Sequence, residues 1–407
     1  MNSRNRCKAY VLLRFQISLM AMLLLALQQQ IQADEGQPVA IRYWPESGIS
    51  IETMWNFHVA IGVDSRNRAM MPRAADVEFI DDFWAASASD TLVLDRRPNE
   101  TKALFQPARN DMEPSSNAVK FSRVVVASAT SDKSISLNVI DIDGVTIVDS
   151  NKHQVSELNA VLQATKELPQ GIRSIDALLV DDAAAEVAAY QTLQALLKPR
   201  VIVLRNSAKL ESSGDVPITR VPHNTFAISK ATVTGKTTWV KLSEVAWEMD
   251  PTLAELFRKK EAACKASREV FAPLSVKQMN FRPSNGTHTP RWNAEHMMGR
   301  ELLFFSQIYH AVDSSIPIID FNPKQMPPDY RAAHADWTGL EESLQMERVE
   351  GFTRRFAYML EGMDLDKTAT GSTFWTPRAL LRQMNVHYTE HTANVVKKKD
   401  LPEWPTE

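Results

Sequence analysis

Cysteine is the rarest residue type in this 407-residue chain, which contains two. Cys7 precedes an apolar N-terminal run, so only Cys264 would remain after removal of that segment. A single thiol cannot form an intramolecular disulfide, and the chain must therefore depend on its hydrophobic cores for stability. Cys264 shares a helical stripe with Phe257 and Phe271, which predicts a buried structural thiol and not a reactive one.

Several catalytic signatures are also missing from the sequence. There is no Gly-x-Gly-x-x-Gly, Walker loop, Gly-x-Ser-x-Gly, His-Glu-x-x-His or Cys-x-x-Cys. Nucleotide binding, serine-hydrolase and zincin chemistry therefore lack support. Low-complexity tracts are absent too, and the composition, 44% hydrophobic and 23% charged, is that of a globular protein long enough for two domains.

The first 33 residues are predicted to be an export signal. Four Arg and Lys side chains precede the apolar run 17–27, and a polar stretch then leads to Ala33. The run is shorter than the roughly 20 residues of a spanning helix, which favours cleavage, although Ile31 fits a small-x-small cleavage site poorly and leaves an uncleaved anchor open. We expect an exported bacterial protein of the periplasm or cell envelope, without a stable membrane span beyond such an anchor.

The charge balance argues against nucleic acid as a partner. Removal of residues 1–33 would take away four positive charges and no negative ones, so the formal charge would change from −3 to −7. Phosphate binding needs Lys and Arg clustered on one face. The short run 397–399 lies at a predicted helix end, where cations favour the helix dipole.

Residues 34–246 alternate short β-type runs with helical stretches, which predicts an α/β (or α+β) domain. Residues 65–122 are predicted to be partly loop, because the segment 95–116 is nearly all polar. The expected strands are 39–43, 49–53, 59–63, 124–127, 135–140, 145–148, 175–180 and 201–204, and the expected helices are 155–166 and 183–197.

Residues 247–407 have the pattern of an all-α four-helix bundle. Asp250 and Thr376 are predicted N-caps, each followed by a proline at the first helical position, and Thr338 forms a capping box with Glu341. The segment 313–336 carries four prolines and must be a loop. The four predicted helices are 251–271, about 292–311, about 338–360 and about 377–398.

Histidine is concentrated in this second half, which holds six of the nine between His288 and His391. His387 and His391 are four residues apart on the apolar stripe of the last helix, so both imidazoles lie on one face and can share an ion. The alternative is a pair of core histidines hydrogen-bonded to backbone or water. A third imidazole would favour the metal, and His296 on the second helix offers one, with His288 and His310 in reserve.

Three neutral imidazoles and a water molecule form an open site for a divalent ion, zinc or nickel above all. Carboxylates lie close by in the sequence at Glu295, Glu301 and Glu390. Glu295 and Glu390 are the candidate general bases for metal-assisted hydrolysis.

Residues 250–400 carry an ordered set of motifs: Leu274, Ser275 and Gln278 in a turn, Pro283 and Gly286 in a loop, Trp292 before an inward His, and His387-x-x-x-His391. This order resembles the DinB/YfiT superfamily of four-helix bundles. The resemblance implies a metal held by His296, His387 and His391, and it implies a homodimer unless the extra domain covers the dimer face. One departure is that the family's usual first ligand position is occupied by Arg300, while His296 lies one turn earlier.

The N-terminal half weakly resembles a metallo-β-lactamase-like fold. Residues 41–64 are similar to its opening strands, and 176–180 and 198–203 to its later buried strands. Its metal motif is absent, because residues 65–152 contain no histidine. The resemblance implies a scaffold or binding surface that has lost its metal, and a plain α/β domain is the alternative.

These features predict an exported metal-binding protein with a DinB-like three-histidine site. It would be a metal-dependent hydrolase or a thiol-linked transferase acting on a small molecule. Hydrolysis is favoured because low-molecular-weight thiols are scarce outside the cytoplasm. The alternative is a non-catalytic envelope protein whose degenerate bundle binds a ligand or a partner.

Overall fold

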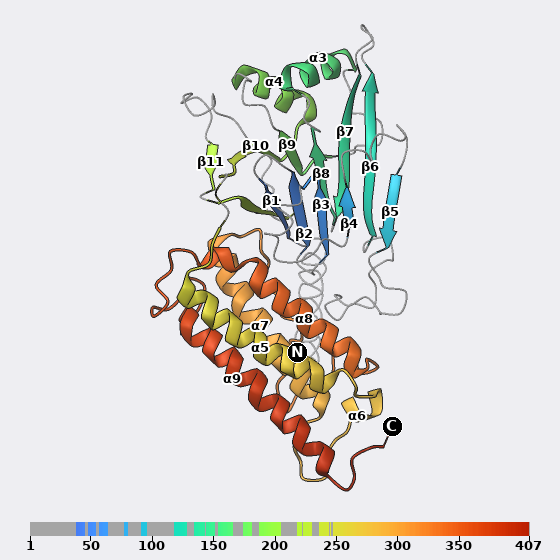
Figure 1. Cartoon of the computed structure of the whole chain (residues 1–407), viewed down its shortest axis with the longest axis vertical. Helices are drawn as coiled ribbons and strands as arrows, with labels where there is room; N and C mark the ends of the chain where they lie inside the picture. The colour runs from blue at the N-terminus through green and yellow to red at the C-terminus, as the bar shows by residue number, and fades with distance from the viewer. Residues whose placement is uncertain are drawn as a thin grey trace, which may run out of the picture. The chain divides into compact units, whose positions relative to one another are not determined.

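The described strands lie in the N-terminal part of the chain together with two helices, and the C-terminal part is helical (Figure 1). The predicted signal at residues 1–33 and the polar segment 96–116 lie outside the described residues. The domain boundaries given above, 1–33, 34–246 and 247–407, stay predictions. The computed structural model describes residues 38–44, 48–53, 57–63, 77–79, 91–95, 118–127, 134–142, 144–150, 154–165, 174–180, 187–204, 218–221, 223–229, 236–243, 245 and 247–406.

The described strands form two sheets. The smaller has the order β12-β1-β2-β3-β4, and the larger, which is mixed, has the order β11-β13-β10-β9-β8-β7-β6-β5. The strands are β1 Val39–Tyr43, β2 Ile49–Thr53, β3 His58–Ile61, β4 Val77–Phe79, β5 Thr91–Asp95, β6 Ala118–Ala127, β7 Ser134–Ile142, β8 Val145–Asp149, β9 Ala177–Val180, β10 Val201–Leu204, β11 Ile218–Arg220, β12 Thr225–Ile228 and β13 Thr238–Lys241.

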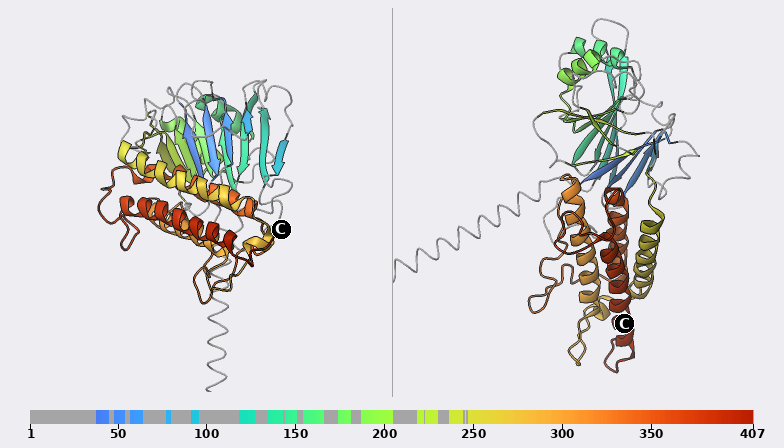
Figure 2. Two further views of the ribbon diagram at one scale, coloured as in Figure 1. Left: turned by 60° about the horizontal axis from the view of Figure 1, so that its bottom comes forward. Right: turned by 90° about the vertical axis from the view of Figure 1, so that its left-hand side faces the viewer.

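The centre of the larger sheet is apolar on both faces, as strands covered on two sides must be. Side chains alternate between faces along a strand, so Ala177 and Leu179 of β9 join the core shared with the smaller sheet, while Leu178 and Val180 face the helices. The covering helices are α3 Val155–Thr165 and α4 Val187–Leu197, which connect the parallel strands β8, β9 and β10. The two sheets and their helices are drawn in Figure 2.

The predicted strands are confirmed where the sequence pattern was local. Residues 65–122, predicted to be partly loop, also contain β4, β5 and the first residues of β6, which the sequence did not predict. These strands depend on pairing with neighbours: β4 pairs with β3, and β5 pairs with β6. Short strands of this kind carry little signal in their own residues.

Each long helix of the C-terminal region begins at a capping side chain. The Asp250 carboxylate accepts hydrogen bonds from the amides of Thr252 and Leu253, and the hydroxyls of Thr338 and Thr376 cap two further helices, as the sequence predicts. The helices are α5 Pro251–Phe271, α6 Val276–Met279, α7 Pro290–Val312, α8 Gly339–Arg355 and α9 Pro377–Val396, with 3₁₀ helices at Ala357–Leu360 and Lys397–Asp400.

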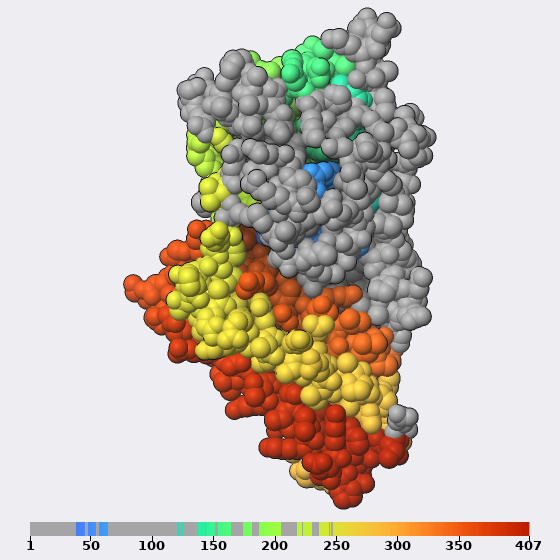
Figure 3. All heavy atoms as spheres, viewed as in Figure 1, coloured from blue at the N-terminus to red at the C-terminus, as the bar shows by residue number. Residues whose placement is uncertain are grey.

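The long helices pack in a closed cycle, in which α5 contacts α8 and α9, and α7 contacts the same two helices. Helices α5 and α9 lie side by side on the face drawn in Figure 3. Cys264 is fully buried in the core of this region, as predicted. None of the helices that the structure describes is both long enough and apolar enough to cross a membrane.

Candidate metal centre

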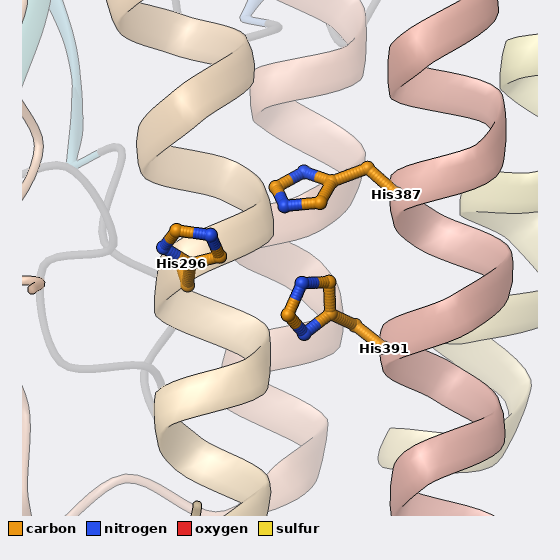
Figure 4. A group of neighbouring side chains, drawn as sticks. All are labelled: His296, His387 and His391. Carbon is orange, nitrogen blue, oxygen red and sulfur yellow. The ribbon is translucent and has the colours of Figure 1, made fainter.

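Three imidazoles converge in the space between α7 and α9 (Figure 4). His296 comes from α7, and His387 and His391 come from successive turns of α9. One nitrogen of each ring lies within 4.8 Å of one nitrogen of each other ring. The ring centroids are 4.9 Å apart for His296 and His387, 5.1 Å for His296 and His391, and 4.5 Å for His387 and His391.

The sequence places these imidazoles inside because both helices are apolar around them. The stripe of α9 that contains His387 also carries Leu380, Met384 and Tyr388, all nearly inaccessible to solvent. His296 and His387 are each only 9% exposed, so their ring nitrogens have little access to water. Burying a polar atom without a partner costs free energy, whereas burying a leucine at the same position would not. Histidines at these positions therefore need a partner for their nitrogens.

The hydrogen-bonding of the cluster fits a metal ion. The Nδ1 atoms of His296 and His387 are buried and have no hydrogen-bond partner among the described residues. Nitrogen ligands of a zinc ion lie about 2.1 Å from it, and the ion would satisfy one orphaned nitrogen on each ring. The cluster among the described residues contains no thiol and no carboxylate.

Electrostatics keep the rings in the form that binds metals. Burial, and after it the positive charge of neighbouring imidazoles and of Arg300, lowers the pKa of His296 and of His387 to about 3. Burial likewise lowers the pKa of His391 to about 4. The imidazoles are thus neutral at physiological pH, and an ion does not have to displace protons from them.

Asn293 orients the third imidazole. Its Oδ1 atom lies 2.7 Å from Nδ1 of His391, and its Nδ2 atom donates to the carbonyl of Thr289 at 2.8 Å. Because the amide NH₂ is committed to that carbonyl, Oδ1 must accept, and the hydrogen-bond network assigns the proton of His391 to Nδ1. Nε2 of His391 is then the nitrogen left for an ion.

We expect Asn293→Ala to weaken metal affinity by about 10- to 100-fold, because an unheld imidazole loses its tautomer and orientation. Competition with a chromophoric chelator measures the affinity, and saturating metal should still give the same stoichiometry. Asn394→Ala, an exposed change on α9, is the matched control. Equal affinities in the two variants would show that the hydrogen bond to His391 does not matter.

The helices that carry the cluster match a known protein family. Residues 261–395 match the model of the DinB superfamily. The helical region thus contains a DinB-like domain at residues 261–395. The chain matches no curated protein and no solved structure. The match supports the resemblance seen in residues 250–400, whereas the metallo-β-lactamase-like resemblance of the N-terminal half is not confirmed.

Two motifs of the DinB-like domain have clear structural roles. Ser275 and Gln278 form a reciprocal capping box at the start of α6. Trp292 lies parallel to His296, with ring centroids 4.6 Å apart, and stacks on His288 on its other side at 3.8 Å. Its indole nitrogen donates to the carbonyl of Gln325 at 2.9 Å, so the loop after α7 holds the ring that supports His296.

The loop can approach α7 closely because Gly299 has no side chain. A Cβ atom at that position would lie 2.7 Å from the Oε1 atom of Gln325. The Gln325 side chain is buried against the helix, 3% exposed. This close approach keeps the loop over the turn of α7 that carries His296.

Neither candidate base, Glu295 or Glu390, belongs to the group of three histidines. Glu295 is buried, and its carboxylate accepts hydrogen bonds from the side chains of Asn322 and Tyr330 and from the amides of Ala333 and His334. Burial raises its pKa. These contacts favour a structural role, the anchoring of residues 322–334 on α7. Glu390 is exposed on α9.

The remaining predicted residues are not members of the cluster. Nδ1 of His310 lies 2.7 Å from the carbonyl oxygen of Ile316, and His288 is exposed on the outer face of Trp292. Glu301 pairs with Lys260 in the core. Sequence reasoning missed Asn293, for which the signal was a polar residue on the buried side of α7, three positions before His296.

Proposed function

We propose that the DinB-like domain is a four-helix bundle that binds one divalent metal ion, zinc or nickel, through His296, His387 and His391. The observation that carries the proposal is the convergence of three imidazoles, of which His296 and His387 are buried and have an Nδ1 atom without a hydrogen-bond partner among the described residues. Helix α7 and helix α9 supply the ligands, and Asn293 and Trp292 orient them.

The proposed reaction is metal-dependent hydrolysis of a small molecule. A divalent ion in such a site lowers the pKa of bound water and polarises a carbonyl oxygen. The described cluster contains no thiol or carboxylate, so an ion held by the three histidines would keep a coordination position for water or substrate, as ions in catalytic sites do. Transfer to a thiol would use the same open position and is the second candidate within this proposal.

We further propose that residues 1–33 are an export signal and that the N-terminal sheets serve as a scaffold or binding surface. The rival function, a non-catalytic protein with a closed or empty site, differs in its coordination. A closed structural site would recruit a fourth protein ligand.

X-ray absorption spectroscopy of the zinc-loaded full chain tests the proposal. We expect a shell of three imidazoles with one or two oxygen ligands from solvent. A fourth imidazole or a sulfur ligand would support a structural ion instead. Hydrolysis of a panel of simple amides and esters should then be abolished by chelation, restored by metal, and lost in His391→Ala.

A further inference from the structure

Arg300 occupies the turn of α7 next to the proposed metal ligands. It follows His296 by four residues and precedes Phe304 by four, so the three side chains lie on one face of the helix. Its guanidinium carbon is 5.8 Å from the centre of the Phe304 ring. The side chain is only half-buried, and this cation therefore borders the cluster on a side that solvent reaches.

The guanidinium has few partners of its own. Within the part of the chain that the structure describes, it makes no hydrogen bond and no ion pair, and its charge acts on His296 and His387. The acidic group on which its charge also acts is Asp320, an exposed residue of the loop after α7. An arginine guanidinium is planar and carries five N–H donors, and no described residue accepts a hydrogen bond from that of Arg300.

This arrangement is unfavourable for a bare metal centre. Three neutral imidazoles bring no negative charge, so a divalent ion at the cluster would keep its full charge beside a second cation. One exposed carboxylate, Asp320, compensates only part of that charge. A bound anion would relieve the repulsion and satisfy the free donors at the same time.

We propose that Arg300 and the ion held by the three histidines together bind an oxyanion, so that the substrate carries a carboxylate or a phosphoryl group next to the bond that reacts. One oxygen of this group would face the ion, and the others would accept hydrogen bonds from the guanidinium. Phe304 supports the guanidinium by a cation–π contact. The inference rests on the proposed function, since it needs the metal.

Titration of the cobalt-loaded full chain with acetate and, separately, with inorganic phosphate tests this inference. Anion binding at the ion changes the visible absorption of cobalt, which gives a dissociation constant without any assay of activity. Arg300→Gln should weaken the preferred anion by about tenfold or more, because a hydrogen-bonded charge pair is lost, and Arg300→Lys should lose less. The stronger of the two anions identifies the substrate class.

Two further variants sharpen the test. Arg382→Gln removes the same charge from an exposed position of α9 and should leave the dissociation constants unchanged. Asp320→Asn removes the competing carboxylate and should tighten anion binding, opposite in sign to Arg300→Gln. A general loss of folding could not produce opposite effects.

The outcomes separate the two proposals. Cobalt binding with the same anion affinity in the parent, Arg300→Gln and Arg382→Gln proteins overturns the oxyanion site and leaves the metal centre standing. Failure of the parent protein to bind cobalt overturns the metal centre, and the oxyanion site with it.

Discussion

Lys260→Met is expected to lower the free energy of unfolding by about 3–5 kcal/mol, because it leaves a buried carboxylate without its counter-charge. Lys260 on α5 and Glu301 on α7 are both fully inaccessible to solvent, and Nζ lies 2.6 Å from Oε1. Glu350 on α8 adds a second carboxylate, whose pKa burial raises. Urea unfolding of the full chain, followed by far-ultraviolet circular dichroism, measures the change.

Lys259→Met is the matched control for that substitution. Lys259 is exposed and pairs with Glu255 at 3.3 Å across one turn of α5, so its removal should leave the urea midpoint where it was. The double variant Lys260→Met, Glu301→Met should regain much of the stability, because a hydrophobic pair removes both buried charges. Equal midpoints for Lys260→Met and Lys259→Met would contradict the account of the core.

Zinc is expected to stabilise the parent protein and to leave the variant His387→Ala, His391→Ala unaffected. A ligand that binds only the folded state at about 1,000 times its dissociation constant adds about 4 kcal/mol. The double variant retains one imidazole of the cluster, which cannot hold the ion alone. Thermal unfolding with zinc and with a chelator gives the shift for each protein.

His288→Ala, His310→Ala is the matched control, since it removes the two histidines that the sequence offers as reserves. His310 contacts the carbonyl of Ile316, so this variant can unfold at a lower temperature, but its zinc-dependent shift should equal that of the parent. If the zinc-dependent shift were lost in His288→Ala, His310→Ala and kept in His387→Ala, His391→Ala, the metal ligands would be His288 and His310 instead.

The fold could be predicted where the signal was local. The caps at Asp250, Thr338 and Thr376 need only a few neighbouring residues, and the helices begin there. Strands β4 and β5 were missed because their stability comes from partners distant in sequence. Helix α7 begins two residues before the expected start, since Thr289 caps it and Pro290 is its first residue.

Some residues of the site could likewise be predicted from local sequence, and others could not. Spacing placed His387 and His391 on one face of α9, and the second predicted helix offered His296 as a third imidazole, which the structure brings into the same cluster. The contacts of Glu295 could not be foreseen, because its partners come from a proline-rich loop without a periodic pattern. The hydrogen bond from His391 to Asn293 joins residues 98 positions apart and has no local sequence signature.

The metal centre is the central claim, and elemental analysis of the purified full chain by inductively coupled plasma mass spectrometry tests it most directly. The account predicts about one divalent ion per chain in the parent protein, after purification or reconstitution, and none in His387→Ala, His391→Ala. A parent protein that holds no ion after reconstitution would contradict it, and so would a double variant that keeps its ion. In the first case the three histidines are residues of the helical core, and in the second the ion is bound elsewhere in the chain.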